Sequence, residues 1–232
     1  MERRDFLGAC GLIAGAALAA AGAPPANAAP RYYRRVKLVD IHGVPIRTSQ
    51  LVAETNYVFQ YPFAATPCFL LKLPKPAATQ ASLRREDGNR YDWSGGVGPD
   101  RTLVAFSAIC AHRLAYPTRE VSFIRYQRRR SATSGGAVIH CCADHSVYDP
   151  TEGARVVSGP APQPLAAILL EWDSAKDEIH AVGTLGGEMF AEFFDKYAFK
   201  LQIEHGGSAR TAVAGTTVVQ ELENYCRQQV KC

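Results

Sequence analysis

The sequence predicts an all-β fold with a small loop-rich subdomain and short helices near its C-terminus. Apolar residues alternate with polar ones or form short runs rich in Val, Ile, Phe and Tyr, which is typical of strands. Pro and Gly separate these segments. Helical periodicity is weak before residue 187. The 232-residue chain, with 47% hydrophobic residues, is long enough to bury a substantial core.

Each expected strand is a short apolar segment that ends at a turn signal. In chain order, the expected strands are residues 34–41, 56–62, 67–73, 102–110, 136–142, 165–173 and 178–184. Residues 74–100 are polar with repeated Pro and Gly, so we expect a long surface loop there. Residues 187–199 and 217–230 can each be written as a short amphipathic helix.

The N-terminus has the pattern of an export signal. Arg3 and Arg4 precede an uncharged Ala/Gly-rich span, and Ala26-Asn27-Ala28 suits cleavage after Ala28. Paired arginines indicate the twin-arginine type, which carries folded proteins across the bacterial inner membrane. We therefore expect a periplasmic protein, attached to the membrane only if the signal is retained as an anchor.

The chain divides into three expected regions. Residues 1–29 form the signal, residues 30–205 the main domain with a ligand-bearing subdomain at about 107–162, and residues 206–232 a C-terminal tail. A net charge of +4 is mild for this length, and no nucleic-acid-binding module accompanies the arginine run at 128–130. We expect no nucleic-acid partner.

Export to an oxidising compartment makes disulfides the default expectation for the cysteines of the exported chain. One of the seven, Cys10, lies in the signal. Cys226 and Cys232 are close together in "CRQQVKC", and we expect a disulfide between them. Cys68 lies in an apolar strand and is expected to be a buried thiol.

Two segments pair a cysteine with a histidine. "ICAHRLAYPT" contains Cys110-x-His112, and "IHCCADHSVYDP" contains Cys142-x-x-His145. Two thiolates and two imidazoles can hold a zinc ion or a two-iron cluster. Structural zinc usually has two or more residues between paired ligands, whereas one intervening residue directs two side chains more naturally to different metal atoms. The spacing therefore favours the cluster.

These motifs resemble the two cluster-binding loops of Rieske iron–sulfur proteins. "GPDRTLVAFSAICAHRLAYPT" is similar to the first loop, "CCADHSVYDPTEG" to the second, and "SGPAP" to the proline-rich loop that covers the cluster. From "PCFLLKL" through "HAVGT", the chain is most similar to the small subunits of arsenite oxidases. The resemblance implies a β-sandwich or barrel body with a small cluster-binding subdomain.

The resemblance also implies one 2Fe–2S cluster and its ligands. Cys110 and Cys142 would bind one iron, and His112 and His145 the other. Such clusters have potentials of roughly −150 to +300 mV, against about −400 mV for plant-type ferredoxins. Four further residues would surround the cluster: Ser146 and Tyr148 as hydrogen-bond donors, and Gly159 and Pro160 in the covering loop.

The second loop departs from the family pattern. Counting back from Tyr148 without a gap places Cys141 and Asp144 in the ligand positions, but Cys142 with His145 preserves C-x-x-H, and we prefer that pair. In high-potential relatives a disulfide braces the two loops, at the positions of Ala115 and Asp144. Neither residue can form it, so we expect a potential below the upper end of the range.

The expected function is single-electron transfer without substrate chemistry of its own. The partner would be a redox protein, either the large subunit of an oxidoreductase or a cytochrome c. Two alternatives stay open: the Rieske component of a quinol-oxidising cytochrome bc-type complex, and a zinc-stabilised binding module. An oxygenase would need a further mononuclear iron domain, for which the chain has neither room nor pattern.

Overall fold

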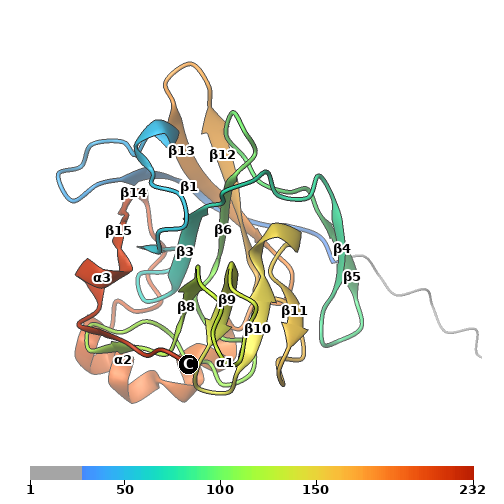
Figure 1. Ribbon diagram of the computed structural model, residues 1–232. Coiled ribbons are helices and arrows are strands. Elements are labelled where there is room, and N and C mark those ends of the chain that lie inside the picture. Colours follow the sequence, from blue (N-terminus) through green and yellow to red (C-terminus); the bar gives the residue numbers. More distant parts are fainter. Residues whose placement is uncertain (1–27) are drawn as a thin grey trace, which may run out of the picture.

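The computed structural model describes residues 28–232, coloured by position in Figure 1. The expected export signal at 1–29 lies outside the described residues except for its last two. Among residues 28–232, no helix is long and apolar enough to cross a membrane.

The body of the protein is one eight-stranded sheet in the order β14-β1-β13-β12-β6-β3-β2-β15. These strands are β1 (Arg31–Val39), β2 (Tyr57–Gln60), β3 (Pro67–Lys72), β6 (Leu103–Ser107), β12 (Ala167–Asp173), β13 (Glu178–Leu185), β14 (Gly215–Val218) and β15 (Gln220–Glu221). Six of the seven expected strands belong to this sheet. The all-β prediction is confirmed.

The centre of the sheet is apolar on both faces. β3 pairs with β2 on one side and β6 on the other, and every residue of β3 except Lys72 is buried. Cys68 is fully buried there, as expected for a structural thiol. An uninterrupted apolar run is the pattern of a strand covered on both faces. β6 continues directly into the first Cys/His segment.

The sheet curls until its ends approach each other. β14 and β15 are separated only by Val219, yet they stand at opposite ends of the strand order. The segment that was expected to be a tail therefore completes the sheet. Its expected helix at 217–230 is wrong: the β-branched run from Thr216 to Val219 is extended, and only α3 (Leu222–Tyr225) is helical.

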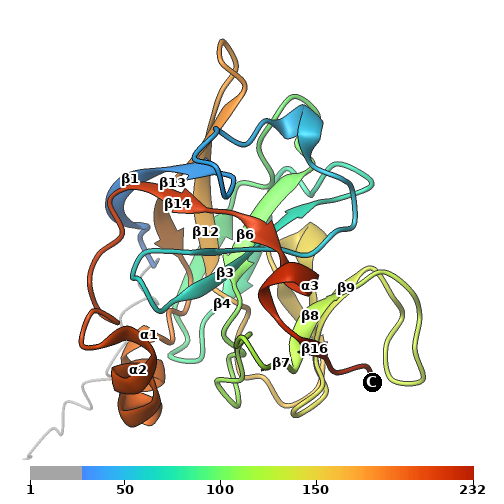
Figure 2. The same ribbon diagram turned by 90° about the vertical axis from the view of Figure 1, so that its left-hand side faces the viewer.

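A smaller sheet carries the second Cys/His segment. It has the order β11-β10-β9-β8 and consists of β8 (Ile124–Gln127), β9 (Val138–Cys141), β10 (Ser146–Asp149) and β11 (Arg155–Ser158). β9 is the seventh expected strand. Beside this sheet, β7 (Val121–Ser122) pairs with β16 (Gln228–Gln229), so the C-terminus runs along the subdomain, as Figure 2 shows.

The region expected to be a long loop contains a hairpin. β4 (Ala81–Arg84) and β5 (Arg90–Trp93) pair antiparallel, and their burial alternates residue by residue. Asp87-Gly88 forms the turn, with Gly88 at φ +87°. Asp-Gly between alternating segments is a strong hairpin signal, but the polar composition of residues 74–100 masks the alternation.

Two helices pack below the sheets, at the level of the chain's C-terminus in Figure 1. α1 (Phe190–Lys196) and α2 (Ala198–His205) meet at Tyr197, within the region where the sequence predicts a helix. Phe190, Phe193 and Phe194 face inward and form a cluster with residues of the first Cys/His segment. The remaining regular elements are two short turns of 3-10 helix, Thr48–Gln50 and Pro150–Glu152.

Candidate metal centre

The first Cys/His segment is a tight chain reversal that follows β6. The Cys110 N–H donates to the Ala115 carbonyl at 2.9 Å, and the Leu114 N–H donates to the Cys110 carbonyl at 3.0 Å. Leu114 adopts the left-handed region at φ +59°. The reversal buries Cys110 completely and leaves the side chain of His112 35% exposed. The loop therefore presents its sulfur inward and its imidazole at the surface.

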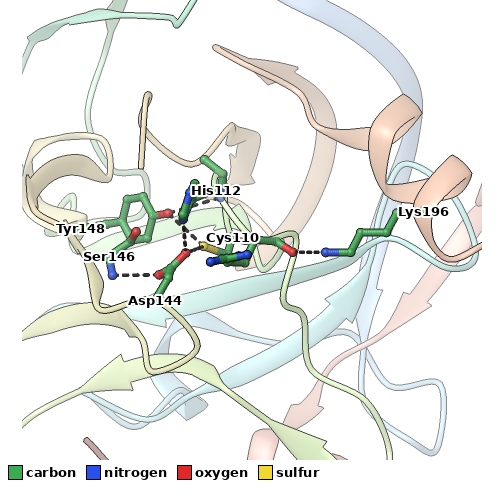
Figure 3. Close-up of polar contacts among 8 residues, drawn as sticks. Cys110, His112, Asp144, Ser146, Tyr148 and Lys196 are labelled. Atoms are coloured by element: carbon green, nitrogen blue, oxygen red, sulfur yellow. Dashed lines mark hydrogen bonds and ion pairs between the residues drawn. The ribbon is translucent and has the colours of Figure 1, made fainter. Parts of the chain in front are cut away.

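The helices hold this first loop in place. Leu114 and Tyr116 pack into the aromatic cluster of α1, where the Tyr116 and Phe193 ring centroids lie 4.9 Å apart. Lys196 donates from Nζ to the Arg113 carbonyl at 2.6 Å, a contact drawn in Figure 3. The loop is anchored at its apolar side and at its tip.

The second segment is the turn between β9 and β10. Cys141 and Ser146 face each other across the strand pair, and four residues connect them. The His145 N–H donates to the Cys141 carbonyl at 2.8 Å, and His145 lies in the left-handed region at φ +59°. Leu114 has the same φ in the first loop and donates in the same way to the Cys110 carbonyl.

The two loops bring four candidate ligand side chains together. Donor atoms of Cys110, Cys141 and Asp144 all lie within 4.8 Å of one another. The Asp144 Oδ2 lies 3.3 Å from the Cys110 sulfur and 2.9 Å from the His112 Nδ1. In Figure 3 the Asp144 carboxylate lies among Cys110, His112 and the backbone of Ser146. Two thiols, an imidazole and a carboxylate are a ligand set for a metal centre.

The electrostatics of this group favour a bound cation. Hydrogen bonds from Cys141 and Tyr148 and from loop amides lower the pKa of Cys110 despite its burial. Burial raises the pKa of Asp144, but the Ser146 N–H and neighbouring side chains outweigh it and hold that pKa below its ordinary value. The Cys110 thiol donates to the Asp144 Oδ2 at 3.3 Å; as thiolate and carboxylate, the two groups would repel each other in this buried site unless a positive charge lay between or beside them.

The surroundings supply donors that point to this centre. The Tyr148 hydroxyl accepts from the Ala111 N–H at 3.2 Å and lies 3.4 Å from the Cys110 sulfur, so its own proton is free for that sulfur. Ser146 is fully buried, and among the described residues its Oγ has no hydrogen-bond partner. A buried hydroxyl without a partner is rare, and it fits an acceptor supplied by a bound group.

The covering segment follows β11. A Cβ on Gly159 would lie 2.5 Å from both the His145 carbonyl oxygen and the Ser146 Cα, so this glycine allows the chain to cross directly over the second loop. Pro160 is exposed beside it. Gly159 is therefore needed because the covering segment crosses so close to the second loop, and not because of a side-chain contact.

Cys142 is not at the centre, and the preference for it over Cys141 is wrong. Its sulfur forms a disulfide with Cys232, 90 residues away. The expected bridge between Cys226 and Cys232 is wrong for the same reason, and Cys226 is a free buried thiol. Adjacent residues on a strand point to opposite faces, so only one of Cys141 and Cys142 can face Cys110.

His145 lies beside a different histidine. Its ring centroid is 5.8 Å from that of His140, and both imidazoles lie near the Cys232 sulfur. His140 is fully buried, whereas His145 is exposed. The structure thus brings together Cys110 and His112 of the four residues expected as ligands, and it adds Cys141 and Asp144. The ungapped count from Tyr148 was the signal that pointed to this pair; His140 had no signal in the sequence.

Two comparisons with known proteins bear on this site. The chain is 28% identical over 187 residues to iodate reductase subunit IdrB of Denitromonas iodatirespirans, covering 80% of this chain and 82% of that protein. It is 30% identical to the soluble domain of the Rieske protein II (soxF) from Sulfolobus acidocaldarius, covering 66% of this chain and 78% of that one. The TM-score for this pair is 0.46. No protein-family model matches the chain.

Proposed function

Because the chain belongs to the Rieske iron–sulfur proteins, we propose that it holds one 2Fe–2S cluster and relays single electrons as the small subunit of a periplasmic oxidoreductase. One observation carries this proposal. Cys110, Cys141, His112 and Asp144 converge from two loops that share the same backbone reversal. When bound, the cluster accepts and releases one electron at a time.

The residues around the loops fit such a group. Bridging sulfides and thiolate sulfurs accept hydrogen bonds, and the Ser146 hydroxyl and the Tyr148 hydroxyl are both available as donors. Cys110 and Cys141 would bind iron through sulfur, and His112 through a ring nitrogen. The partly exposed His112 side chain would form the edge through which electrons leave.

The proposed partner is a larger catalytic subunit. The relative is named as a subunit of iodate reductase, and we interpret the sequence motifs as similar to those of arsenite oxidase small subunits. Both kinds of enzyme act on oxyanions, which supports an oxyanion-converting large subunit as the partner. A free carrier that exchanges electrons with a cytochrome c is the second form of the same function. The twin-arginine motif supports export after the cluster has been inserted.

Metal analysis of the exported protein tests the proposal. The full chain, produced in a bacterium with its own signal, is isolated from the periplasm, and iron, zinc and acid-labile sulfide are measured. We expect iron and sulfide in equal amounts and a paramagnetic resonance signal only after reduction. Zinc without iron would instead support the binding module.

Co-purification from the native cells identifies the partner. We expect a catalytic oxidoreductase subunit to be retained with the chain. Retention of cytochrome b and cytochrome c1 instead would support the quinol-oxidising alternative and contradict the proposed partnership.

A further inference from the structure

We propose that the Asp144 carboxylate is the fourth ligand of the cluster, in the position that a second histidine was expected to fill. The inference rests on the proposed function, since it concerns how the same cluster is held. The ligand set would then be two thiolates, one imidazole and one carboxylate.

The direction of the Asp144 side chain is the first support. Its Oδ1 accepts from the Ser146 N–H at 2.9 Å, which fixes the carboxylate. Its Oδ2 is thereby aimed at the other ligands, 3.3 Å from the Cys110 sulfur and 2.9 Å from the His112 Nδ1 (Figure 3). One oxygen holds the side chain in place while the other faces the centre.

The burial of this carboxylate is the second support. Only 3% of the Asp144 side chain is exposed, and no Lys or Arg of the described residues forms an ion pair with it. Burying an ionised carboxylate among thiols is costly unless a cation compensates it. Within residues 28–232, His112 is the only basic partner at ion-pair distance. Iron would supply the missing positive charge.

The repeat of the two loops is the third support. In each loop a left-handed residue at φ +59° donates its N–H to the carbonyl of the ligand cysteine: Leu114 to Cys110, and His145 to Cys141. Leu114 packs into the aromatic cluster of the helices and has no ligand atom. His145 is therefore equivalent to Leu114: it occupies the left-handed position that shapes the turn, and this backbone conformation favours Gly.

The remaining contacts hold His145 away from the centre. It lies exposed beside His140, and the disulfide from Cys142 to Cys232 ties the start of the turn to the C-terminus. Moving His145 into the site would require the turn to shift by a residue. That shift would also exchange Cys141 for the disulfide-bonded Cys142.

A carboxylate in place of an imidazole changes the charge of the centre. It adds one negative charge next to iron, which stabilises the oxidised state relative to the reduced state. It also leaves His112 as the single imidazole bound to iron. We therefore expect a lower reduction potential than that of the same protein with two histidine ligands.

The test uses the full-length reduced protein and counts nitrogen atoms bound to iron by pulsed electron paramagnetic resonance. Three forms are compared: wild type, His145→Gly and Asp144→His. His145→Gly removes the rival imidazole and suits the left-handed backbone. Asp144→His supplies the second imidazole. Iron content is measured for each form, with Asp144→Ala as an additional variant.

We expect one coordinated nitrogen in wild type and in His145→Gly, with equal iron content. Asp144→His should show two nitrogens and a higher potential, and Asp144→Ala should lose most of its iron. Two nitrogens in wild type, or loss of iron in His145→Gly, would overturn the carboxylate ligand but leave the cluster in place. Wild-type protein without iron would overturn the proposed function, and the ligand assignment with it.

Discussion

Cys142 and Cys232 are joined by a disulfide that fastens the last residue of the chain to the second ligand loop. The first loop is held separately, by the aromatic cluster of α1 and by the bond from Lys196 to Arg113. High-potential Rieske proteins, by the resemblance of the sequence motifs, link the two loops to each other, and Ala115 in the first loop cannot form such a link. Each loop here is instead braced from outside.

Removing this disulfide should lower stability without removing iron. Cys142→Ser and Cys232→Ser each open a bridge between residues 90 positions apart. Disulfides typically stabilise a protein by about 2–4 kcal/mol through the entropy of the unfolded chain, and the stabilisation is larger for long loops such as this one. We expect a lower melting temperature in both variants, measured by calorimetry.

The two variants are matched controls for each other. Because neither sulfur is proposed as a ligand, they should retain equal amounts of iron and the same absorption spectrum. Loss of iron in Cys142→Ser alone would show that Cys142 binds metal, against the arrangement described above.

Ser146→Ala should separate stability from potential. The Ser146 Oγ is buried without a hydrogen-bond partner among the described residues. An unsatisfied buried polar group costs about 1–3 kcal/mol of folding free energy, and the substitution removes this cost. The metal-free variant should melt at the same or a higher temperature. With the cluster bound, loss of the hydroxyl donor should lower the reduction potential. If the metal-free Ser146→Ala variant melts at a lower temperature than metal-free wild type, the Ser146 hydroxyl has a hydrogen-bond partner and the prediction is wrong.

Tyr148→Phe should lower both stability and potential. The hydroxyl satisfies the Ala111 N–H and lies 3.4 Å from the Cys110 sulfur. Leaving a buried amide unpaired costs about 1–3 kcal/mol. Tyr126→Phe is the control, because Tyr126 is equally buried but bonds to Glu54. It should lose stability while leaving the potential, measured by redox titration, unchanged. Equal potentials in the two variants would argue against a bond from Tyr148 to the cluster.

The fold was predictable where the apolar pattern is strong. β1, β12 and β13 are long strands and β3 is buried except at Lys72, and their alternation or continuity is visible in the sequence. The segment after residue 205 was not predictable from periodicity. There, Thr217 and Val219 gain their burial from pairing with β1 and packing on the core, which no local pattern reports.

The site was predictable in kind but not in register. The order of cysteine and histidine residues indicates two ligand loops. Cys110 and His112 can be assigned as candidate ligands from the sequence alone. The choice between Cys141 and Cys142 depends on which face of β9 meets the first loop, and a one-residue slip reverses every side chain. The disulfide to Cys232 also fixes that choice, and a contact between residues 90 positions apart leaves no local trace.

Asp177 should make stability depend on acid pH. Burial raises its pKa, but hydrogen bonds from Thr48, Trp172 and the backbone at Thr48 and Ser49 lower it to about 2, against 3.8 ordinarily. Its stabilising contribution is therefore present above pH 3.8 and is lost as pH falls from 3.8 toward 2. Asp177→Asn suits the φ of +52° but removes the charge. The variant should be less stable at pH 7, with the difference disappearing near pH 2 in denaturant titrations. A difference that is constant with pH would contradict this origin.

Gly159→Ala should expose the cluster by displacing the covering segment. The added Cβ would meet the His145 carbonyl oxygen and the Ser146 Cα at 2.5 Å, and the φ of +90° is unfavourable for alanine. Gly43→Ala is the matched control, since Gly43 has φ +80° but nothing within 4 Å of the added carbon. Both variants should lose stability from the backbone conformation. Only Gly159→Ala should also bleach faster in air, followed by visible absorption, because its covering segment must lift from the second loop. Equal bleaching rates would mean that this segment does not shield the cluster.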